Sequence, residues 1–262
     1  MNIKTWFCGR TKEITRCVSF TSALLLAASS LQAPGSAQIT FPSSAVVNVK
    51  NYGAKGNGTN DDTAAINNAI KANIGTGNVL YFPAGTYLVS NRLEWRSSNG
   101  TWYCYLSLKG AGQSHTTIKL KNNCSGYTSS QSPRSVIHTA SLNSHNPSNV
   151  GGEEGAGNDG YRNHIEDLTI DVGTGNVGAI GIDWCATNEG GMRNVTVKSG
   201  NRQGKYGINL GRALSAGPNF LRNVTVNGFD YGIHADEYYS SGSTIDTISL
   251  SNQNIAGIYL RY

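Results

Sequence analysis

Four polar residues occupy the same place in a phrase that recurs through the second half of the sequence. Each of them follows a Gly-Ile pair: Asp183, Asn209, His234 and Tyr259. Two positions further along, the same four repeats carry Cys185, Gly211, Asp236 and Arg261. A surface that combines carboxylate, amide, imidazole, phenol and guanidinium groups can donate to and accept from many hydroxyl groups. These residue types therefore favour a hydroxyl-rich ligand such as a sugar chain.

Two reactions on a sugar chain would use these groups. Glycoside hydrolysis needs two carboxylates either about 5–5.5 Å or about 6.5–9.5 Å apart, and Asp183 and Asp236 stand somewhat further apart on an ideal stack of repeats. Elimination from a uronate needs a base near the C5 proton, for which His234 is suited. We predict that the catalytic residues are Asp183, His234 and Asp236. We predict that the substrate-binding residues are Asn209, Tyr259 and Arg261. The simpler interpretation is that outward residues of a repeat protein are polar whatever its function.

A repeat of about 25 residues must position these side chains. The glycines that open the phrase are 26, 25 and 25 residues apart: Gly181, Gly207, Gly232 and Gly257. A second phrase alternates with it and reads IEDLTI from Ile165, MRNVTV from Met192, LRNVTV from Leu221 and IDTISL from Ile245. Apolar and polar residues alternate within both phrases, which indicates strands rather than helices. The pattern predicts an all-β protein, a right-handed single-stranded parallel β-helix.

Stacking of the coils about 4.8 Å apart would turn equivalent positions into columns. Two columns should point inward: Ile182, Ile208, Ile233 and Ile258, and Trp184, Leu210, Ala235 and Leu260. The alternation then predicts that Asp183, Asn209 and His234 are exposed along one face. In the second phrase, Asp167, Asn194 and Asn223 should form a ladder of side-chain hydrogen bonds that resembles the amide ladders of known β-helices.

The segment before the repeats predicts a cover for one end of the stack. A strand at 46–50 leads into a Gly-rich loop and then a helix at 62–72. Its apolar face would consist of Ala64, Ala65, Ile66, Ala69 and Ile70. An open β-helix end exposes apolar side chains and unpaired strand edges, so a short helix lying across it protects against aggregation. We interpret Asp61 and Asp62 as groups that cap this helix.

The same segment carries a family resemblance. The runs NYGAKGNGTNDDTAAI (51–66) and VLYFPAGTYLV (79–89) resemble the opening of the pectate-lyase-like superfamily. That superfamily includes rhamnogalacturonase-type, epimerase-like and exo-β-1,3-glucanase-type β-helix proteins and several phage tailspikes. The resemblance implies a β-helix that engages polysaccharide. The run YGIHADE (231–237) also resembles the Tyr/Asp/His motif of mannuronan epimerases, with His and Asp in swapped order.

The N-terminus predicts export. Four basic residues precede an apolar run and then small residues that end at Ala37, as in a secretory signal of residues 1–37. Its removal would leave 17 of 21 basic and 15 of 16 acidic residues, a net charge of +2. This near-neutral balance gives no indication of nucleic-acid binding, and the apolar run is too short to span a membrane. We expect a secreted, periplasmic or extracellular protein that is not held in a membrane once the signal is removed.

Three cysteines remain after the predicted signal: Cys104, Cys124 and Cys185. In an exported protein Cys104 and Cys124 could pair, since they flank one turn region. No Cys-x-x-Cys pair and no His/Cys cluster with metal spacing occurs. We therefore expect no metal and no cofactor.

Two further segments carry expectations. The polar stretch 148–160 should form a protruding loop with Glu153, Glu154 and Asp159, and it is a weaker candidate for lining a ligand groove. Residues 38–262 should form one β-helix domain. The sequence stops in the middle of a coil, so we expect a truncated domain in which 257–262 is an uncovered edge strand.

These observations favour an exported β-helix protein that binds and cleaves a polysaccharide, as a relative of glycoside hydrolases or polysaccharide lyases. The alternative is a non-catalytic polysaccharide-binding or adhesion module of tailspike type. A pair of carboxylates at hydrolytic separation on one groove would favour the enzyme. Aromatic and amide side chains in their place would favour the binding module.

Overall fold

A computed structural model describes residues 45–142, 154–212, 217–236 and 242–261. All of them belong to one compact unit, residues 41–262. The predicted signal segment, residues 1–37, lies outside the described residues. So does part of the predicted protruding loop, since the description resumes at Glu154.

Short strands make up most of the described chain. They are β1 (Val46–Asn48), β2 (Asn57–Asp61), β3 (Val79–Phe82), β4 (Gly85–Val89), β5 (Leu93–Glu94), β6 (Ser107–Gly110), β7 (Thr116–Leu120), β8 (Arg134–His138), β9 (His164–Asp171), β10 (Ala179–Asp183), β11 (Gly190–Lys198), β12 (Tyr206–Asn209), β13 (Asn219–Asn227), β14 (Tyr231–Asp236), β15 (Ser243–Ser251) and β16 (Ala256–Arg261). The helical elements are η1 (Val49–Tyr52), a short 3-10 helix, and α1 (Thr63–Asn73).

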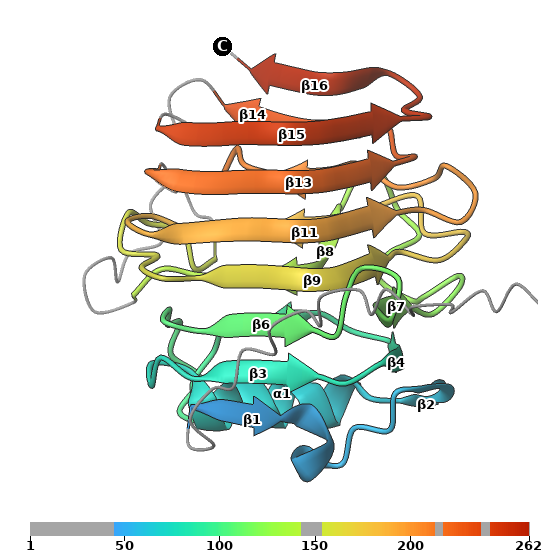
Figure 1. Cartoon of the computed structure of the whole chain (residues 1–262). Helices are drawn as coiled ribbons and strands as arrows, with labels where there is room; N and C mark the ends of the chain where they lie inside the picture. The colour runs from blue at the N-terminus through green and yellow to red at the C-terminus, as the bar shows by residue number, and fades with distance from the viewer. Residues whose placement is uncertain (1–44, 143–153, 213–216, 237–241, 262) are drawn as a thin grey trace, which may run out of the picture. The chain divides into compact units, whose positions relative to one another are not determined.

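The strands stack into two parallel sheets. The larger sheet runs β1-β3-β6-β9-β11-β13-β15, with β2, β4 and β7 joined beside β9, and the smaller one runs β16-β14-β12-β10-β8-β5. Successive coils of the second half each give one strand to each sheet, as β9 and β10 do, then β11 and β12 (Figure 1). Every pairing between these strands is parallel. The predicted parallel β-helix is therefore confirmed.

The predicted inward columns lie in the core except at the last strand. Ile182 pairs in register with Ile208, which pairs with Ile233. All three are fully buried, as are Trp184 and Leu210 to within a few per cent, which confirms the predicted register. Burial of one such side chain stabilises the fold by about 1.5–3 kcal/mol.

The last strand lacks this cover. Within the described chain β16 pairs with β14 and with no other strand, which confirms the expected edge strand. Ile258 is therefore 52% exposed and Leu260 40% exposed, although both stand in the inward columns. The same sequence phrase buries its apolar residues only where a further coil stacks on it.

Helix α1 packs against η1, β3 and β5 at the N-terminal end of the stack. Ile66, Ala69 and Ile70 are buried as predicted, whereas Ala64 is exposed. The two acidic residues before the helix have different hydrogen-bond partners. Asp61 accepts from the Thr63 amide at 3.0 Å, as a cap would. The buried carboxylate of Asp62 makes no capping bond and instead accepts from the amides of the Gly-rich loop, so its predicted role is corrected.

The predicted polar ladder is present. Asn194 donates to the Asp167 carboxylate at 2.7 Å, and Asn223 donates to the Asn194 carbonyl at 2.8 Å. These residues have left-handed backbones, with φ of 56°, 51° and 52° for Asp167, Asn194 and Asn223. Asn and Asp tolerate this conformation better than most residues. Asp and Asn at these positions therefore both tolerate the left-handed backbone and form side-chain hydrogen bonds between successive coils.

Cys104 and Cys124, for which the sequence left a disulfide open, are not joined. Both are buried thiols, as is Cys185. Cys124 donates to the Ser90 carbonyl at 3.2 Å, whereas the Cys104 carbonyl accepts from the amide of Gly75. The two therefore lie at different corners of the coil. Burial raises the pKa of Cys104 to about 12, so this thiol stays protonated.

Candidate functional site

The outward row predicted from the repeats is longer than the sequence suggested. Strand register aligns six residues across the smaller sheet: Glu94, His138, Asp183, Asn209, His234 and Tyr259. The last four are the predicted members. Glu94 and His138 were missed because β5 and β8 lack the Gly-Ile phrase. The run SVIHTA (135–140), which indicates a strand, was the available signal for His138.

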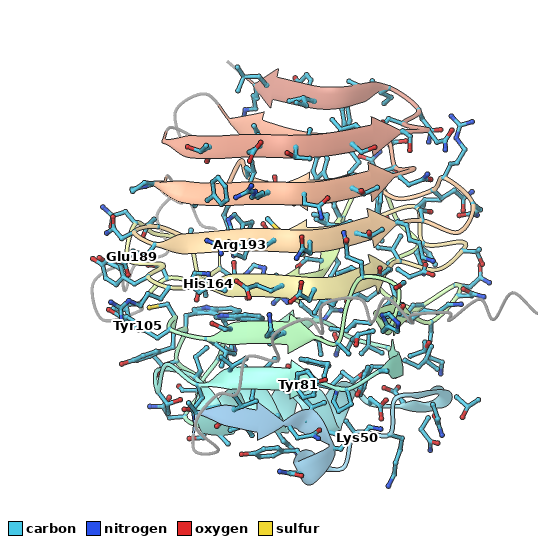
Figure 2. The ribbon with its side chains drawn as sticks, in the orientation of Figure 1. Lys50, Tyr81, Tyr105, His164, Glu189 and Arg193 are labelled. Atoms are coloured by element: carbon cyan, nitrogen blue, oxygen red, sulfur yellow. The ribbon has the colours of Figure 1, made fainter. Side chains whose placement is uncertain are left out.

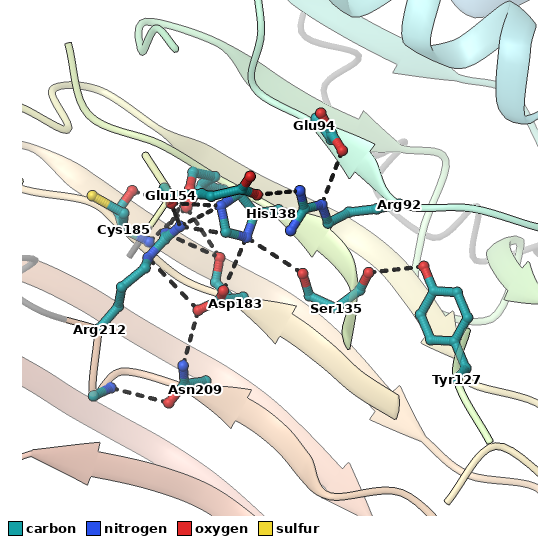
Figure 3. A network of polar contacts seen from close by, with 12 residues as sticks. Arg92, Glu94, Tyr127, Ser135, His138, Glu154, Asp183, Cys185, Asn209 and Arg212 are labelled. Carbon is teal, nitrogen blue, oxygen red and sulfur yellow. Dashed lines mark hydrogen bonds and ion pairs between the residues drawn. The ribbon is translucent and has the colours of Figure 1, made fainter. Parts of the chain in front are cut away.

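Asp183 is the centre of a buried polar cluster (Figure 3). Its carboxylate lies 2.9 Å from Nδ1 of His138, accepts from Asn209 at 2.9 Å and lies 3.7 Å from Nε of Arg212. Burial alone would raise the pKa of Asp183, but the Arg212 guanidinium, then His138 and Asn209, hold it well below its usual range. Asp183 is therefore an ionised carboxylate, which can accept hydrogen bonds but cannot donate one.

His138 is held neutral beside it. Burial, and then the charge of Arg212, lower the pKa of His138. The ionised Asp183 accepts from Nδ1, and Nε2 lies 2.7 Å from Nη1 of Arg212 and 2.9 Å from the Glu154 carbonyl oxygen. The Trp102 ring packs on the imidazole with centroids 5.1 Å apart. Both nitrogens of His138 are thus occupied within the protein.

Arg212 closes the cluster and was not found from the sequence. It follows β12 and is only 3% exposed. One guanidinium nitrogen donates to the Thr139 carbonyl at 2.5 Å, and another lies 3.2 Å from the Glu154 carbonyl. A buried charge needs such compensation. No repeat pattern marks position 212, so only the folded chain brings it to Asp183.

Asn209 connects this cluster to His234. Its amide nitrogen must face Asp183, since an ionised carboxylate only accepts. Its carbonyl oxygen then faces Nδ1 of His234 at 2.7 Å, so Nδ1 carries the proton. In a neutral ring the basic lone pair is therefore on Nε2. The chain of contacts fixes which nitrogen of His234 can act as a base.

His234 lies between two tyrosine rings. Its imidazole stacks on Tyr206 with centroids 4.3 Å apart, and on Tyr259 at 5.7 Å. The predicted exposure of the row is therefore wrong for His234, which is 9% exposed, because these rings cover it. Asp183 and Asn209 are half-buried rather than exposed. Tyr259 remains 41% exposed.

The remaining predicted residues lie further along the same strands. Asp236 pairs in register with Arg261, two residues beyond His234 and Tyr259. Arg261 is exposed on β16, and the side chain of Asp236 lies outside the described set. The structure thus brings Asp183, Asn209 and His234 into one connected chain of contacts. For Asp236 it gives the backbone position only.

The other end of the row is rich in paired charges. Arg92 contacts Glu94 at 3.0 Å and Glu154 at 2.7 Å, so the described part of the predicted loop reaches the row. Arg96 lies 4.0 Å over the Trp102 ring. A cavity of about 280 Å³ opens here and is lined in part by Arg92, Glu94 and Arg96. A polar ligand could extend from the row into this cavity.

Across the described ranges, no group of three or more His, Cys, Asp or Glu residues is arranged to hold a metal ion. In the same part of the chain, no helix has the length and apolar character needed to cross a membrane.

Residues 46–261 match the family model described as rhamnogalacturonase A/epimerase, pectate lyase-like. The chain belongs to this family. The family match covers both sheets, including the row from Glu94 to Tyr259. The resemblance inferred from the N-terminal segment is therefore confirmed.

Matches to individual proteins cover only part of each of those proteins. The chain is 26% identical over 197 residues to a probable glucan endo-1,3-beta-glucosidase of Arthroderma benhamiae, a match that covers 71% of this chain and 20% of the relative. It is 45% identical over 74 residues to the mannuronan C5-epimerase AlgE2 of Azotobacter vinelandii, covering 28% of this chain and 7% of the relative. The Agl-KA catalytic domain superposes with a TM-score of 0.61 at 20% identity, covering 85% of this chain and 35% of that one. The chain thus spans a fifth or less of these two curated relatives, and the likeness to the solved structure concerns the fold.

Proposed function

We propose that this protein acts on a uronate-containing polysaccharide by removing the proton at C5, as a lyase or an epimerase does, with His234 as the base. The observation that carries the proposal is the chain of contacts from Asp183 through Asn209 to His234. A base oriented by a second group, which is itself held by a third, is the usual arrangement of an activated side chain. Asp183 acts through Asn209 and is a positioning residue in this scheme.

Hydrolysis, the other predicted reaction, has less support on this face. It requires a carboxylic acid that keeps its proton near neutral pH. The pKa of Asp183 is lowered by Arg212, and the pKa of Glu154 is lowered by its hydrogen bond to Arg92. Both carboxylates are therefore ionised. Asp236 remains the carboxylate proposed for direct contact with substrate.

The reaction can be written for elimination. Nε2 of His234 takes the C5 proton, the C5–H electron pair forms the C4=C5 double bond, and the C4–O bond breaks. The leaving oxygen needs a proton, for which we propose Tyr206, whose pKa is raised by burial so that its hydroxyl stays protonated. Arg261 would bind the uronate carboxylate and Tyr259 would stack on a sugar ring, with Asn209 as a further polar contact. Return of a proton to C5 from the other side would give epimerisation instead.

Polysaccharide as the substrate class is supported by the family and by relatives described as a glucosidase and an epimerase. Export is expected from residues 1–37, which would bring the protein to extracellular or periplasmic polymers. The proposal requires neither a metal nor a cofactor, because His234, Tyr206 and Arg261 supply the base, the proton donor and the cation.

The test uses polymannuronate and polygalacturonate as substrates. Elimination is followed by the ultraviolet absorbance of the unsaturated product, and epimerisation by deuterium uptake at C5 from heavy water. We expect His234→Ala to lower the rate by about 100-fold or more, the usual contribution of a general base. His115→Ala, at a histidine remote from the row in sequence and in register, is the matched control and should leave the rate unchanged. Equal rates for His234→Ala and the parent would refute His234 as the base.

A second candidate function is binding without turnover. Tyr206, Tyr231 and Tyr259 form a ladder of rings, with centroids 5.7 Å apart for the first pair and 5.1 Å for the second. Aromatic rings beside the Asn209 amide are the features expected of a sugar-binding module. Binding of a uronate polymer, with no product of elimination, epimerisation or hydrolysis, would favour this function.

A further inference from the structure

A second hollow lies on the larger sheet, away from the row described above. It has a volume of about 550 Å³ at the edge where β9, β11, β13 and β15 begin, and its lining includes His164, Glu189, Arg193, Asn219 and Phe220. A smaller cavity of about 400 Å³ shares Glu189 with it. Figure 2 shows His164 and Arg193 on the outward side of this sheet, with Glu189 near the strand starts. This volume is within the range of sites for small ligands.

The hollow contains a slot between two rings. His164, Gly191 and Phe220 occupy the same row on β9, β11 and β13. Neighbouring strands are about 4.8 Å apart, so the two ring-bearing residues stand about 10 Å apart with only a glycine between them. A Cβ on Gly191 would lie 2.8 Å from the Phe220 carbonyl oxygen, so the backbone disfavours any side chain here and none separates the two rings. A flat ring fits the resulting space.

One positive charge in the hollow has no carboxylate partner within the part of the chain that the structure describes. The row two residues along contains Arg193 between two ion pairs, Lys109–Glu166 at 3.2 Å and Arg222–Asp246 at 3.3 Å. Among the described residues Arg193 makes no ion pair or hydrogen bond. Its exposed guanidinium lies 5.9 Å from the centre of the Phe220 ring.

The other titratable groups of the lining do not cancel this charge. Glu189 is paired with Arg162 at 2.9 Å. Burial lowers the pKa of His164, so its imidazole is neutral near pH 7. The charge left for a ligand is that of Arg193. A guanidinium binds a carboxylate through two parallel hydrogen bonds.

From these observations we propose that the hollow is a second saccharide site, which binds a carboxylate-bearing sugar unit without transforming it. The carboxylate lies on Arg193, and one face of the sugar ring packs on Phe220. The adjoining cavity is lined by Tyr105 and Tyr161, whose rings are 5.8 Å apart, and takes the neighbouring sugar. This anchoring function does not depend on the chemistry proposed for His234.

The test is calorimetric titration of the full chain with galacturonate and mannuronate hexasaccharides and with their carboxyl-reduced forms. We expect Arg193→Gln to reduce the number of hexasaccharides bound per chain by one, or to weaken that binding step about tenfold or more. Arg222→Gln is the matched control, since Arg222 occupies the same row on the next strand and does not line the hollow. It should change affinity less than about twofold. The carboxyl-reduced ligands should lose this step in the parent.

Two results would overturn the proposal: equal binding by Arg193→Gln and Arg222→Gln, or equal binding of charged and reduced ligands at this step. Arg193→Lys keeps the charge and loses the planar fork, so intermediate affinity is expected. Each variant is first compared with the parent by its unfolding midpoint, so that loss of folding is recognised. If the parent has no turnover but Arg193→Gln still loses the step, the proposed chemistry fails and the anchoring site stands. If turnover depends on His234 and Arg193→Gln binds like the parent, the anchoring site fails and the proposed chemistry stands.

Discussion

The outward rows of the two sheets have the same origin in the sequence and very different surroundings. On the smaller sheet, His138, Asp183 and Arg212 have side chains that are 4%, 13% and 3% exposed. On the larger sheet, the ion pair of Arg222 with Asp246 is 62% and 48% exposed. Trp102, the Glu154 segment and Arg212 cover the first row. The second faces solvent.

This difference in cover decides what the charges do. In the covered row each charge must be compensated by a neighbour, because water cannot do it. The result is an ionised carboxylate, a neutral imidazole and one fixed proton position on His234. In the open row water screens the charges, so paired groups contribute little and an unpaired guanidinium such as Arg193 remains available to a ligand. An alternating polar pattern therefore indicates a site only when loops close over it.

The strongest test of this comparison removes Arg212, which covers the first row, and Arg222, which belongs to the second. We expect Arg212→Ala to destabilise the fold by about 3–5 kcal/mol, since it leaves Asp183 buried without its guanidinium. Arg222→Ala should cost about 1 kcal/mol or less, as for exposed ion pairs in general. Urea unfolding midpoints measure both. Similar losses for the two variants would mean that cover does not separate the rows.

As pH falls, we expect the covered row on the smaller sheet to lose stability before the open row on the larger sheet. The folded-state pKa of His138 is lowered from 6.5, so below about that pH the unfolded chain binds a proton that the folded chain does not. The stability from neutral His138 is therefore present above pH 6.5 and is lost as pH falls towards the folded pKa, by at most about 1.4 kcal/mol per pH unit. Asp183, whose pKa is also lowered, adds a further loss below about pH 4.

The check is unfolding stability measured between pH 7 and 4.5. His138→Gln should flatten this dependence relative to the parent, because Gln cannot take up the proton. An unchanged slope in His138→Gln would contradict the assignment of a neutral, buried imidazole.

A smaller effect is expected in the solvent-exposed ladder. Asn194→Ala removes the hydrogen bonds to Asp167 and Asn223 and leaves an alanine at φ 51°. We expect a loss of about 1–2 kcal/mol, most of it from the backbone. Asn194→Gly loses the same bonds without the backbone penalty and should cost less. If the two variants lose equal stability, the side-chain bonds rather than the backbone explain the choice of Asn.

Much of the fold could be predicted from local pattern. Ile208 and Ile233 lie in the core because alternation within a strand separates its two faces whatever the neighbours are. The spacing of Gly181, Gly207 and Gly232 predicts the register, since one coil must match the next. The sequence could not decide whether Cys104 and Cys124 pair, because nearness in sequence says little about which corner of the coil each thiol occupies.

The sequence by itself determined the parallel β-helix, its inward columns and the row from Asp183 to Tyr259, because these depend on a short repeat that each coil satisfies alone. Tertiary structure decided that His138 and Glu94 extend the row, that Arg212 closes over Asp183, and that the rings of Tyr206 and Tyr259 bury His234. These residues come from irregular segments or from neighbouring coils, and no period relates them. Burial and protonation are properties of the assembled neighbours, so they arise only once the loops have folded over the sheet.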